Sequence, residues 1–217
     1  MNADGRGEAT RIDLESWERR ELFRFFDGYS EPFHGVCVRV DCTESFRYAK
    51  DHHLSVFLTL LHRNLLAAHG VENLMMRSVH GEVWRYPTIL GGSAVGRANG
   101  TIGFAYFRFH EGLQEFVREA AIEVNRVKAS DALERYPGQD LIRYSVLPWL
   151  DFTSLSHARD FSKRDSIPLI TFGKITEASG RWTMPVSIHV HHGLVDGEQV
   201  GRFVGLFEER LAAPESD

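Results

Sequence analysis

Apolar residues recur along the chain at two spacings, one typical of helices and one typical of strands. Four stretches have apolar positions three or four residues apart, which predicts amphipathic helices over residues 13–26, 54–70, 113–127 and 198–211. Asp13 is a candidate cap for the first of these. Gly70 is expected to end the second, which is apolar on most faces and should therefore be largely buried.

Other stretches alternate or run apolar over shorter lengths, as strands do. Residues 35–43 alternate valines with other residues, and Thr43 could cap a short helix through Tyr48. The stretch 73–88 predicts a hairpin that turns at His80 and Gly81. Further strands are expected within residues 100–109, 140–150, 167–175 and 182–192, and the last two should be joined by the turn at 177–180.

Strands that alternate with helices but also form hairpins indicate an α+β fold, a mixed sheet covered by helices on one side. We find no internal repeat, low-complexity tract or Pro/Ser-rich linker in the sequence. We therefore expect a flexible N-terminus over residues 1–12 and one domain over residues 13–213.

Composition excludes several classes of protein. Apolar residues make up 43% of the chain, and fifteen phenylalanines provide ample material for a core. A net charge of −5 gives no basic field to attract nucleic acid or an anionic membrane. No unbroken apolar run reaches about 18 residues and the N-terminus has no signal-peptide pattern, so we expect no membrane association. Cys37 and Cys42 alone suggest reduced thiols and a cytoplasmic location.

The stretch HVHHGLVDG, residues 189–197, concentrates groups that can do chemistry. A metal site would use His189, His191, His192 and Asp196, but successive strand residues point to opposite faces, so the three histidines should not converge. Alternatively the histidines fill the sheet, which suits His189. His192 ends an apolar strand and precedes a glycine, which is where a proton-transfer group would be presented.

The HHGLVDG of residues 191–197 resembles the HHxxxDG signature of the chloramphenicol acetyltransferase superfamily. WERRELFRFF at 17–26, YSVLPWLDFTS at 144–154 and PLITFGKI at 168–175 resemble further blocks of that family in the same order, so the resemblance spans nearly the whole chain. Condensation domains need two such halves, and dihydrolipoyl acyltransferases usually carry a lipoyl domain as well, and neither arrangement fits 217 residues. The resemblance therefore implies a stand-alone acetyltransferase, assembled as a homotrimer with active sites between subunits.

The resemblance also implies a mechanism. His192 would be the general base that removes a proton from an acceptor hydroxyl as its oxygen attacks the thioester of acetyl-CoA, in a sequential reaction. Ser145 would hydrogen-bond the oxyanion of the tetrahedral intermediate, and Thr171 would steady the same intermediate through water. On residue pattern alone, Ser145 and Thr171 are ordinary strand residues.

Further residues acquire roles through the same resemblance. Asp196 would be structural and would pair with Arg19 of the N-terminal helix, so that His192 is held in place. Trp149 and Lys174 would lie near coenzyme A, an indole against its apolar part and an ammonium against a phosphate. The co-substrate would be acetyl-CoA, and no metal is expected.

The acceptor site departs most from the family pattern. The positions expected to contact the acceptor are Phe25, Phe26, Ile102, Leu155 and His157. His157 and Arg159 stand where the chloramphenicol enzymes tend to have Leu and Val, and an unpaired guanidinium beside an apolar ligand would be costly. The expected acceptor is chloramphenicol or a related small molecule. The alternatives are an acyltransferase with a more polar acceptor, a non-catalytic ligand-binding homologue and a metal-binding protein.

Overall fold

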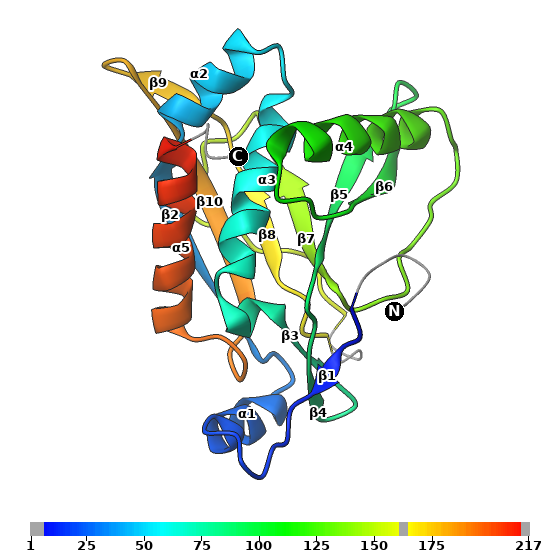
Figure 1. The fold of residues 1–217 in the computed structure, drawn as a ribbon, viewed down its shortest axis with the longest axis vertical. Helices are drawn as coiled ribbons and strands as arrows, with labels where there is room; N and C mark the ends of the chain where they lie inside the picture. Colours follow the sequence, from blue (N-terminus) through cyan, green and yellow to red (C-terminus); the bar gives the residue numbers. More distant parts are fainter. Residues whose placement is uncertain (1–6, 161–164, 214–217) are drawn as a thin grey trace.

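A computed structural model describes residues 7–160 and 165–213 (Figure 1). The helices are α1 (Arg20–Asp27), α2 (Thr43–Asp51), α3 (Val56–His69), the short 3-10 helix η1 (Glu72–Met75), α4 (Leu113–Lys128) and α5 (Gly197–Ala212). The strands are β1 (Thr10–Arg11), β2 (Phe33–Asp41), β3 (Met76–Val79), β4 (Glu82–Arg85), β5 (Leu90–Gly96), β6 (Ile102–Phe107), β7 (Leu141–Val146), β8 (Leu169–Phe172), β9 (Thr176–Ala178) and β10 (Arg181–His191).

The main sheet is mixed, as the sequence predicted. Its strand order is β2-β10-β8-β7-β5-β6, and the short β9 pairs with β10 to give seven strands. β7 runs parallel to both β5 and β8, whereas the other pairings are antiparallel. A second, three-stranded sheet has the order β1-β4-β3.

Helices cover one face of the main sheet. In Figure 1, α3 and α5 lie side by side in front of the strands, α4 lies in front of β5 and β6, and α1 sits apart at the lower end. On β10, Val186, Ile188 and Val190 are fully buried in the core beneath these helices. The alternation of a strand therefore turns Ser187, His189 and His191 to the opposite face of the sheet.

The N-terminal region differs from its prediction. The helix expected from residue 13 begins at Arg20, because the Asp13 carboxylate accepts hydrogen bonds from Glu15 N (3.1 Å) and Ser16 Oγ (2.9 Å) and so closes a turn instead. The flexible segment expected over residues 1–12 is wrong at Thr10 and Arg11, which pair with β4, and its first six residues lie outside the described part of the chain.

Two further predictions need correction. Thr43 does not cap α2 but is its first residue, and the Asp41 carboxylate accepts from the Thr43 amide at 2.9 Å. β5 was not predicted, because Gly91 and Gly92 weaken its strand pattern. A Cβ on Gly92 would lie 2.9 Å from Leu141 Cδ1, so the glycine permits close approach of neighbouring side chains.

The predicted hairpin is confirmed. His80 and Gly81 have φ values of 53° and 81°, the left-handed conformations that a two-residue turn between twisted strands requires.

Within the described residues, no helix is both long and apolar enough to cross a bilayer.

Candidate active site

His192 stands immediately after the last residue of β10. Its amide donates to the carbonyl of Pro32 at 2.7 Å, and its ring stacks on Phe26 with centroids 4.0 Å apart and planes 9° from parallel. Nδ1 is buried without a hydrogen-bond partner among the described residues, so Nε2 is the ring nitrogen open to the surface. An imidazole whose outward nitrogen has no protein partner can accept a proton from a bound molecule.

The turn that follows His192 is tightly built. The amides of Leu194 and Val195 both donate to the His191 carbonyl, at 3.0 and 2.9 Å. Gly193 passes against α1, since a Cβ there would lie 3.1 Å from the Phe23 Cα. A side chain at this position would push α1 away from the turn that carries His192.

Asp196 ends this turn and caps α5. Its carboxylate accepts from the Glu198 amide at 3.1 Å, and its own amide donates to the Gln199 side chain at 2.9 Å, a capping box. The carboxylate also lies 2.9 Å from Arg19 Nη1, the pair that the resemblance implied. The helix predicted over residues 13–26 would have Arg19 in its middle. In the structure, Arg19 instead directly precedes the first residue of α1.

Electrostatics favour the ionised Asp196. Burial opposes its charge, but the hydrogen bond and charge of Arg19, together with the backbone bonds, outweigh burial and lower the pKa of Asp196. The arrangement therefore joins the N-terminal segment to the turn after His192 at neutral pH.

The other two histidines of the stretch have separate surroundings. His189 Nε2 lies 3.2 Å from the Leu155 carbonyl. His191 is 3% exposed, and its Nε2 lies 3.9 Å from Asp27 Oδ1. Burial lowers the pKa of His191 to about 4, although Asp27 opposes this shift. The three histidines thus do not converge on one point, as the alternation of strand residues predicted.

Ser145 and Thr171 are partners in adjacent parallel strands, β7 and β8. Thr171 is fully buried, and its hydroxyl lies 2.9 Å from His157 Nε2. Burial, His189 and Arg159 all lower the pKa of His157, which favours its neutral form. Two hydroxyl groups suited to bonding an oxyanion or a water are therefore neighbours on the face opposite the helices.

One chain does not bring these hydroxyl groups to His192. Thr171 pairs with Ser187 of β10, and His191 lies four residues further along that strand, about 13 Å away at the rise of an extended chain. His192 lies beyond His191. Hydrogen-bonding contact with one reacting centre needs separations of about 3 Å, so one copy of the chain does not contain the full set.

The expected acceptor residues fall into three places. Phe26 stacks on His192, and Phe25, which is 60% exposed, packs edge-on against Phe26 at 5.1 Å. Leu155 and His157 lie in the loop that covers β8 and β10. Ile102 begins the edge strand β6, two strands from β7, and is half exposed. Within the described part of one chain, Phe26 is the member of this set that contacts the His192 ring.

Trp149 and Lys174 are brought together by the turn after β7. The Lys174 amide donates to the carbonyl of Leu150 at 2.8 Å, next to Trp149. Trp149 is 78% exposed, an unusual state for an indole, and Lys174 is also exposed. An exposed indole and an exposed lysine on adjoining segments suit a ligand that carries both an apolar part and a phosphate.

Arg159 is a paired cation. Its Nε lies 3.4 Å from Glu31 Oε1, and its guanidinium lies 3.3 Å from the centre of the Phe33 ring. The concern that Arg159 would be an unpaired charge is thus removed. Phe33 and His34 were missed as neighbours of the histidine stretch, because their contacts depend on the register of β2 with β10, which the sequence alone does not give. Glu31 was missed because its partner, Arg159, lies in a distant loop.

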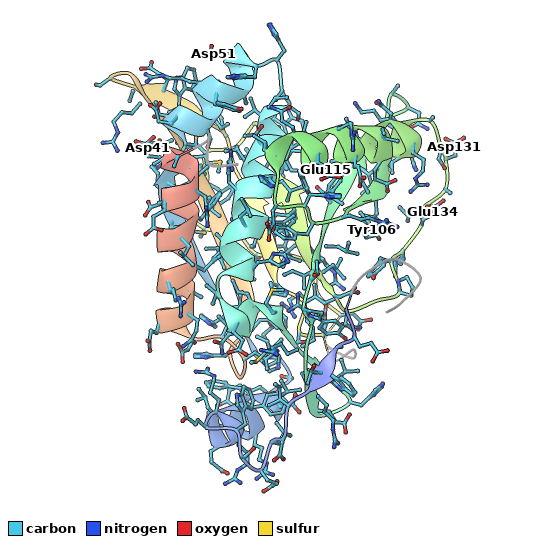
Figure 2. The ribbon with its side chains drawn as sticks, in the orientation of Figure 1. Asp41, Asp51, Tyr106, Glu115, Asp131 and Glu134 are labelled. Carbon is cyan, nitrogen blue, oxygen red and sulfur yellow. The ribbon has the colours of Figure 1, made fainter. Side chains whose placement is uncertain are left out.

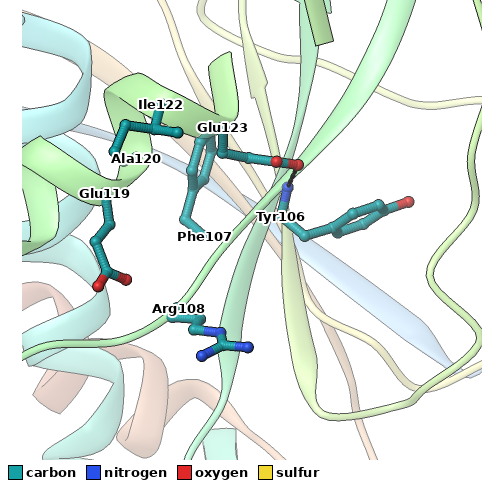
Figure 3. Close-up of a pocket in the computed structure, with 7 residues that line it drawn as sticks. All are labelled: Tyr106, Phe107, Arg108, Glu119, Ala120, Ile122 and Glu123. Carbon is teal, nitrogen blue, oxygen red and sulfur yellow. Dashed lines mark hydrogen bonds between the residues drawn. The ribbon is translucent and has the colours of Figure 1, made fainter. Parts of the chain in front are cut away.

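A pocket of about 320 Å³ lies between β6 and α4, away from these residues (Figure 3). It is lined by Tyr106, Phe107, Arg108, Glu119, Ala120, Ile122 and Glu123. None of the residues expected to act in catalysis or binding lines it. The pocket is thus separate from the candidate active site around His192.

One group near this pocket has the residue types of a metal site. His110, Glu115 and Glu119 place ligand atoms within 4.8 Å of one another, and Glu115 is labelled on α4 in Figure 2. Each nitrogen of the His110 ring already faces a carboxylate, Glu119 at 2.8 Å and Glu115 at 3.5 Å. The group is separate from the histidine stretch that first raised the question of a metal.

The family model named "CAT: Chloramphenicol acetyltransferase" matches residues 8–208. A chloramphenicol acetyltransferase of Bacillus pumilus is 24% identical over 194 residues, 88% of each chain, and one of Proteus mirabilis is 22% identical over 202 residues, 91% of this chain and 92% of its own. A solved chloramphenicol acetyltransferase superposes with a TM-score of 0.85 at 29% identity, over 94% of this chain and 100% of its own. The chain thus belongs to the chloramphenicol acetyltransferase family and is an acyltransferase.

A more distant likeness concerns the fold alone. A probable dihydrolipoamide acetyltransferase of Listeria monocytogenes superposes with a TM-score of 0.63 at 15% identity, over 99% of this chain and 98% of its own. The mixed sheet covered by helices is therefore the acyltransferase fold that the sequence predicted.

Proposed function

We propose that the protein transfers the acetyl group of acetyl-CoA to a hydroxyl of chloramphenicol or a related small molecule. The curated relatives that span the chain are named for this acceptor. The observation that carries the proposal is the presentation of His192, whose ring is fixed by Phe26 while Nε2 remains open. A catalytic base needs a fixed position and an unoccupied nitrogen.

In the proposed reaction, His192 Nε2 takes the proton of the acceptor hydroxyl while the oxygen attacks the thioester carbonyl. Ser145 donates a hydrogen bond to the resulting oxyanion, and Thr171 acts beside it. Collapse of the intermediate releases the thiol of coenzyme A, which receives the proton from His192. Both substrates bind together and no acyl-histidine forms.

In the proposed site the reacting groups come from two copies of the chain. The distance along β10 supports this, since Thr171 and His192 stand at different places on one subunit. Large apolar side chains are also exposed at Phe25, Ile102, Trp149 and Leu150, as expected where another subunit packs. We infer a homotrimer in which His192 of one subunit faces Ser145 and Thr171 of the next.

Trp149 and Lys174 are the residues we assign to coenzyme A. Trp149 follows Ser145 by four residues, just after the end of β7, and Lys174 follows Thr171 by three residues, just after the end of β8. The thioester would then extend from these residues towards the two hydroxyl groups. We place the protein in the cytoplasm, where acetyl-CoA is supplied, and assign no metal to the reaction.

Polar side chains at one side of the proposed site bear on the choice of acceptor. His157 and the Arg159–Glu31 pair make one side of the site more polar than an apolar acceptor needs. The alternative function is therefore acetylation of a more polar hydroxyl compound by the same chemistry. A non-catalytic homologue is disfavoured, because a binding protein would not need His192, Ser145, Thr171 and Asp196 together.

The test is release of coenzyme A thiol from acetyl-CoA by the wild type and His192→Ala. Turnover with chloramphenicol that is lost in the variant supports both the chemistry and the acceptor. Turnover with a polar hydroxyl compound but not with chloramphenicol supports the alternative. Thiol release that does not require His192 contradicts the proposal.

A further inference from the structure

His34 lies against His192 although nothing in the sequence marked it. It sits on β2 opposite Val190 of β10, and its ring centre is 4.3 Å from that of His192, with planes inclined by 37°. His34 is half-buried. The base therefore has a second imidazole as a neighbour, in addition to the Phe26 ring.

The hydrogen bond of His34 fixes its own state. Nε2 lies 3.1 Å from the Val195 carbonyl, and a carbonyl only accepts, so Nε2 carries the proton. Burial lowers the pKa of His34, the bond to Val195 opposes this, His192 and His189 lower it further, and Asp196 raises it. At neutral pH the ring is an uncharged donor to the turn.

This bond completes a set of restraints on the turn after His192. The His192 amide is bound to Pro32, two residues before His34, at 2.7 Å. Val195 is bound to His34, and the next residue, Asp196, is bound to Arg19 at 2.9 Å. The turn is thus held at its start and twice at its end, by segments distant in sequence.

On this geometry we propose that His34 is a positioning residue for His192. Its N–H fixes the Val195 carbonyl, and its ring packs against the base, so that His192 keeps Nδ1 buried and Nε2 directed outwards. The inference rests on the proposed function, in which His192 is the base. His34 touches no reacting atom in this account.

Three variants test this role. His34→Phe keeps a ring but removes the N–H, whereas His34→Gln keeps an amide donor that can reach the carbonyl. His52→Phe is the matched control. His52 also binds a backbone carbonyl, that of Tyr48 at 2.9 Å, and stacks on an aromatic ring at 4.0 Å, but it lies just after the end of α2. Thermal unfolding of all three is measured alongside kinetics.

We expect His34→Phe to lower kcat about tenfold or more while KM for acetyl-CoA stays within about twofold, since the base is misplaced but the thioester site is intact. His34→Gln should stay within about threefold of wild-type kcat, and His52→Phe should match the wild type. A kcat for His34→Phe equal to that of His52→Phe overturns the inference. A fall in kcat for His34→Gln as large as that for His34→Phe also overturns it. If His34→Phe does not fold, His34→Gln alone decides by the same limit.

A readout without turnover separates this inference from the proposed function. If the wild type acetylates no acceptor, the proposed function fails, and the ¹⁵N resonances of the imidazoles are compared instead. The inference predicts one His192 tautomer, protonated at Nδ1, in the wild type and a mixture in His34→Phe. Identical His192 resonances in the two proteins overturn it.

Discussion

Arg19 Nη1 and Asp196 Oδ2 lie 2.9 Å apart, although 177 residues separate them in sequence. The pair joins the residue before α1 to the N-cap of α5, which ends the turn after His192. We therefore expect the pair to act on catalysis by holding His192 in position, without contact with substrate.

We predict that Arg19→Val and Asp196→Ala each lower kcat at least tenfold and reduce the free energy of unfolding by about 1–3 kcal/mol, the cost of leaving a partly buried partner unpaired. Turnover and urea unfolding measure the two effects. Arg24→Val is the control, since Arg24 of α1 makes an exposed ion pair with Glu15 at 2.8 Å. Unchanged turnover in the Arg19 or Asp196 variant would contradict the positioning role.

The same pair predicts a pH dependence. The folded pKa of Asp196 is lower than the unfolded value of about 3.9, so its contribution to stability is present above that unfolded value and is lost as pH falls through the folded pKa. Between pH 5 and pH 2, Asp196→Asn should therefore lose less unfolding free energy than the wild type. Parallel pH profiles of the two proteins would count against this assignment.

His191 predicts acid sensitivity at a higher pH. Its pKa of about 4 when folded lies below the ordinary value, so the unfolded chain binds the extra proton first and stability falls as pH drops from about 6.5 towards 4. The wild type should lose on the order of 1–2 kcal/mol more than His191→Gln between pH 7 and pH 5. The measurement is urea unfolding at both pH values. An equal loss in both proteins would show that His191 does not titrate in this way.

The acceptor assignment predicts a change of specificity. His157→Leu with Arg159→Val removes the polar groups near Thr171 and Phe33, and Glu31→Gln accompanies them so that no partly buried carboxylate is left without its cation. The triple variant should lower KM for chloramphenicol by about threefold to tenfold through apolar contact. Arg47→Val, an exposed change on α2, is the control. An unchanged KM would remove these side chains from the acceptor site.

The coenzyme site predicts a different kinetic signature. Trp149→Ala should raise KM for acetyl-CoA about tenfold while kcat stays within about twofold, because the indole would bind ground state and transition state alike. Ile122→Ala, another exposed apolar residue, should leave both constants unchanged. A loss confined to kcat would place Trp149 outside the coenzyme site.

The sequence predicted those parts of the molecule that local pattern determines. α3, α4, the hairpin at His80 and the strand ending at His191 follow from spacing and turn chemistry. The capping box of Asp196 and Gln199 was missed, although an aspartate three residues before a glutamine before an apolar helix is a readable signal.

The missed contacts around His192 depend on tertiary register. His34 is one of many half-buried strand residues until β2 is aligned with β10, and Glu31 acquires a partner only when the loop with Arg159 folds over Phe33. The pairing of Arg19 with Asp196 came from family resemblance, since no local rule links residues so far apart. The separation of Thr171 from His192 likewise needs the strand register.

In the proposed reaction, His192 of one subunit acts with Ser145 of another. The most direct test mixes two variants, His192→Ala and Ser145→Ala, each almost inactive alone, by refolding them together and measuring thiol release with the best acceptor. In a trimer with shared sites, each mixed assembly contains one intact site, so an equal mixture should recover about a quarter of wild-type activity. Activity that stays at the level of the separate variants would contradict a site shared between subunits.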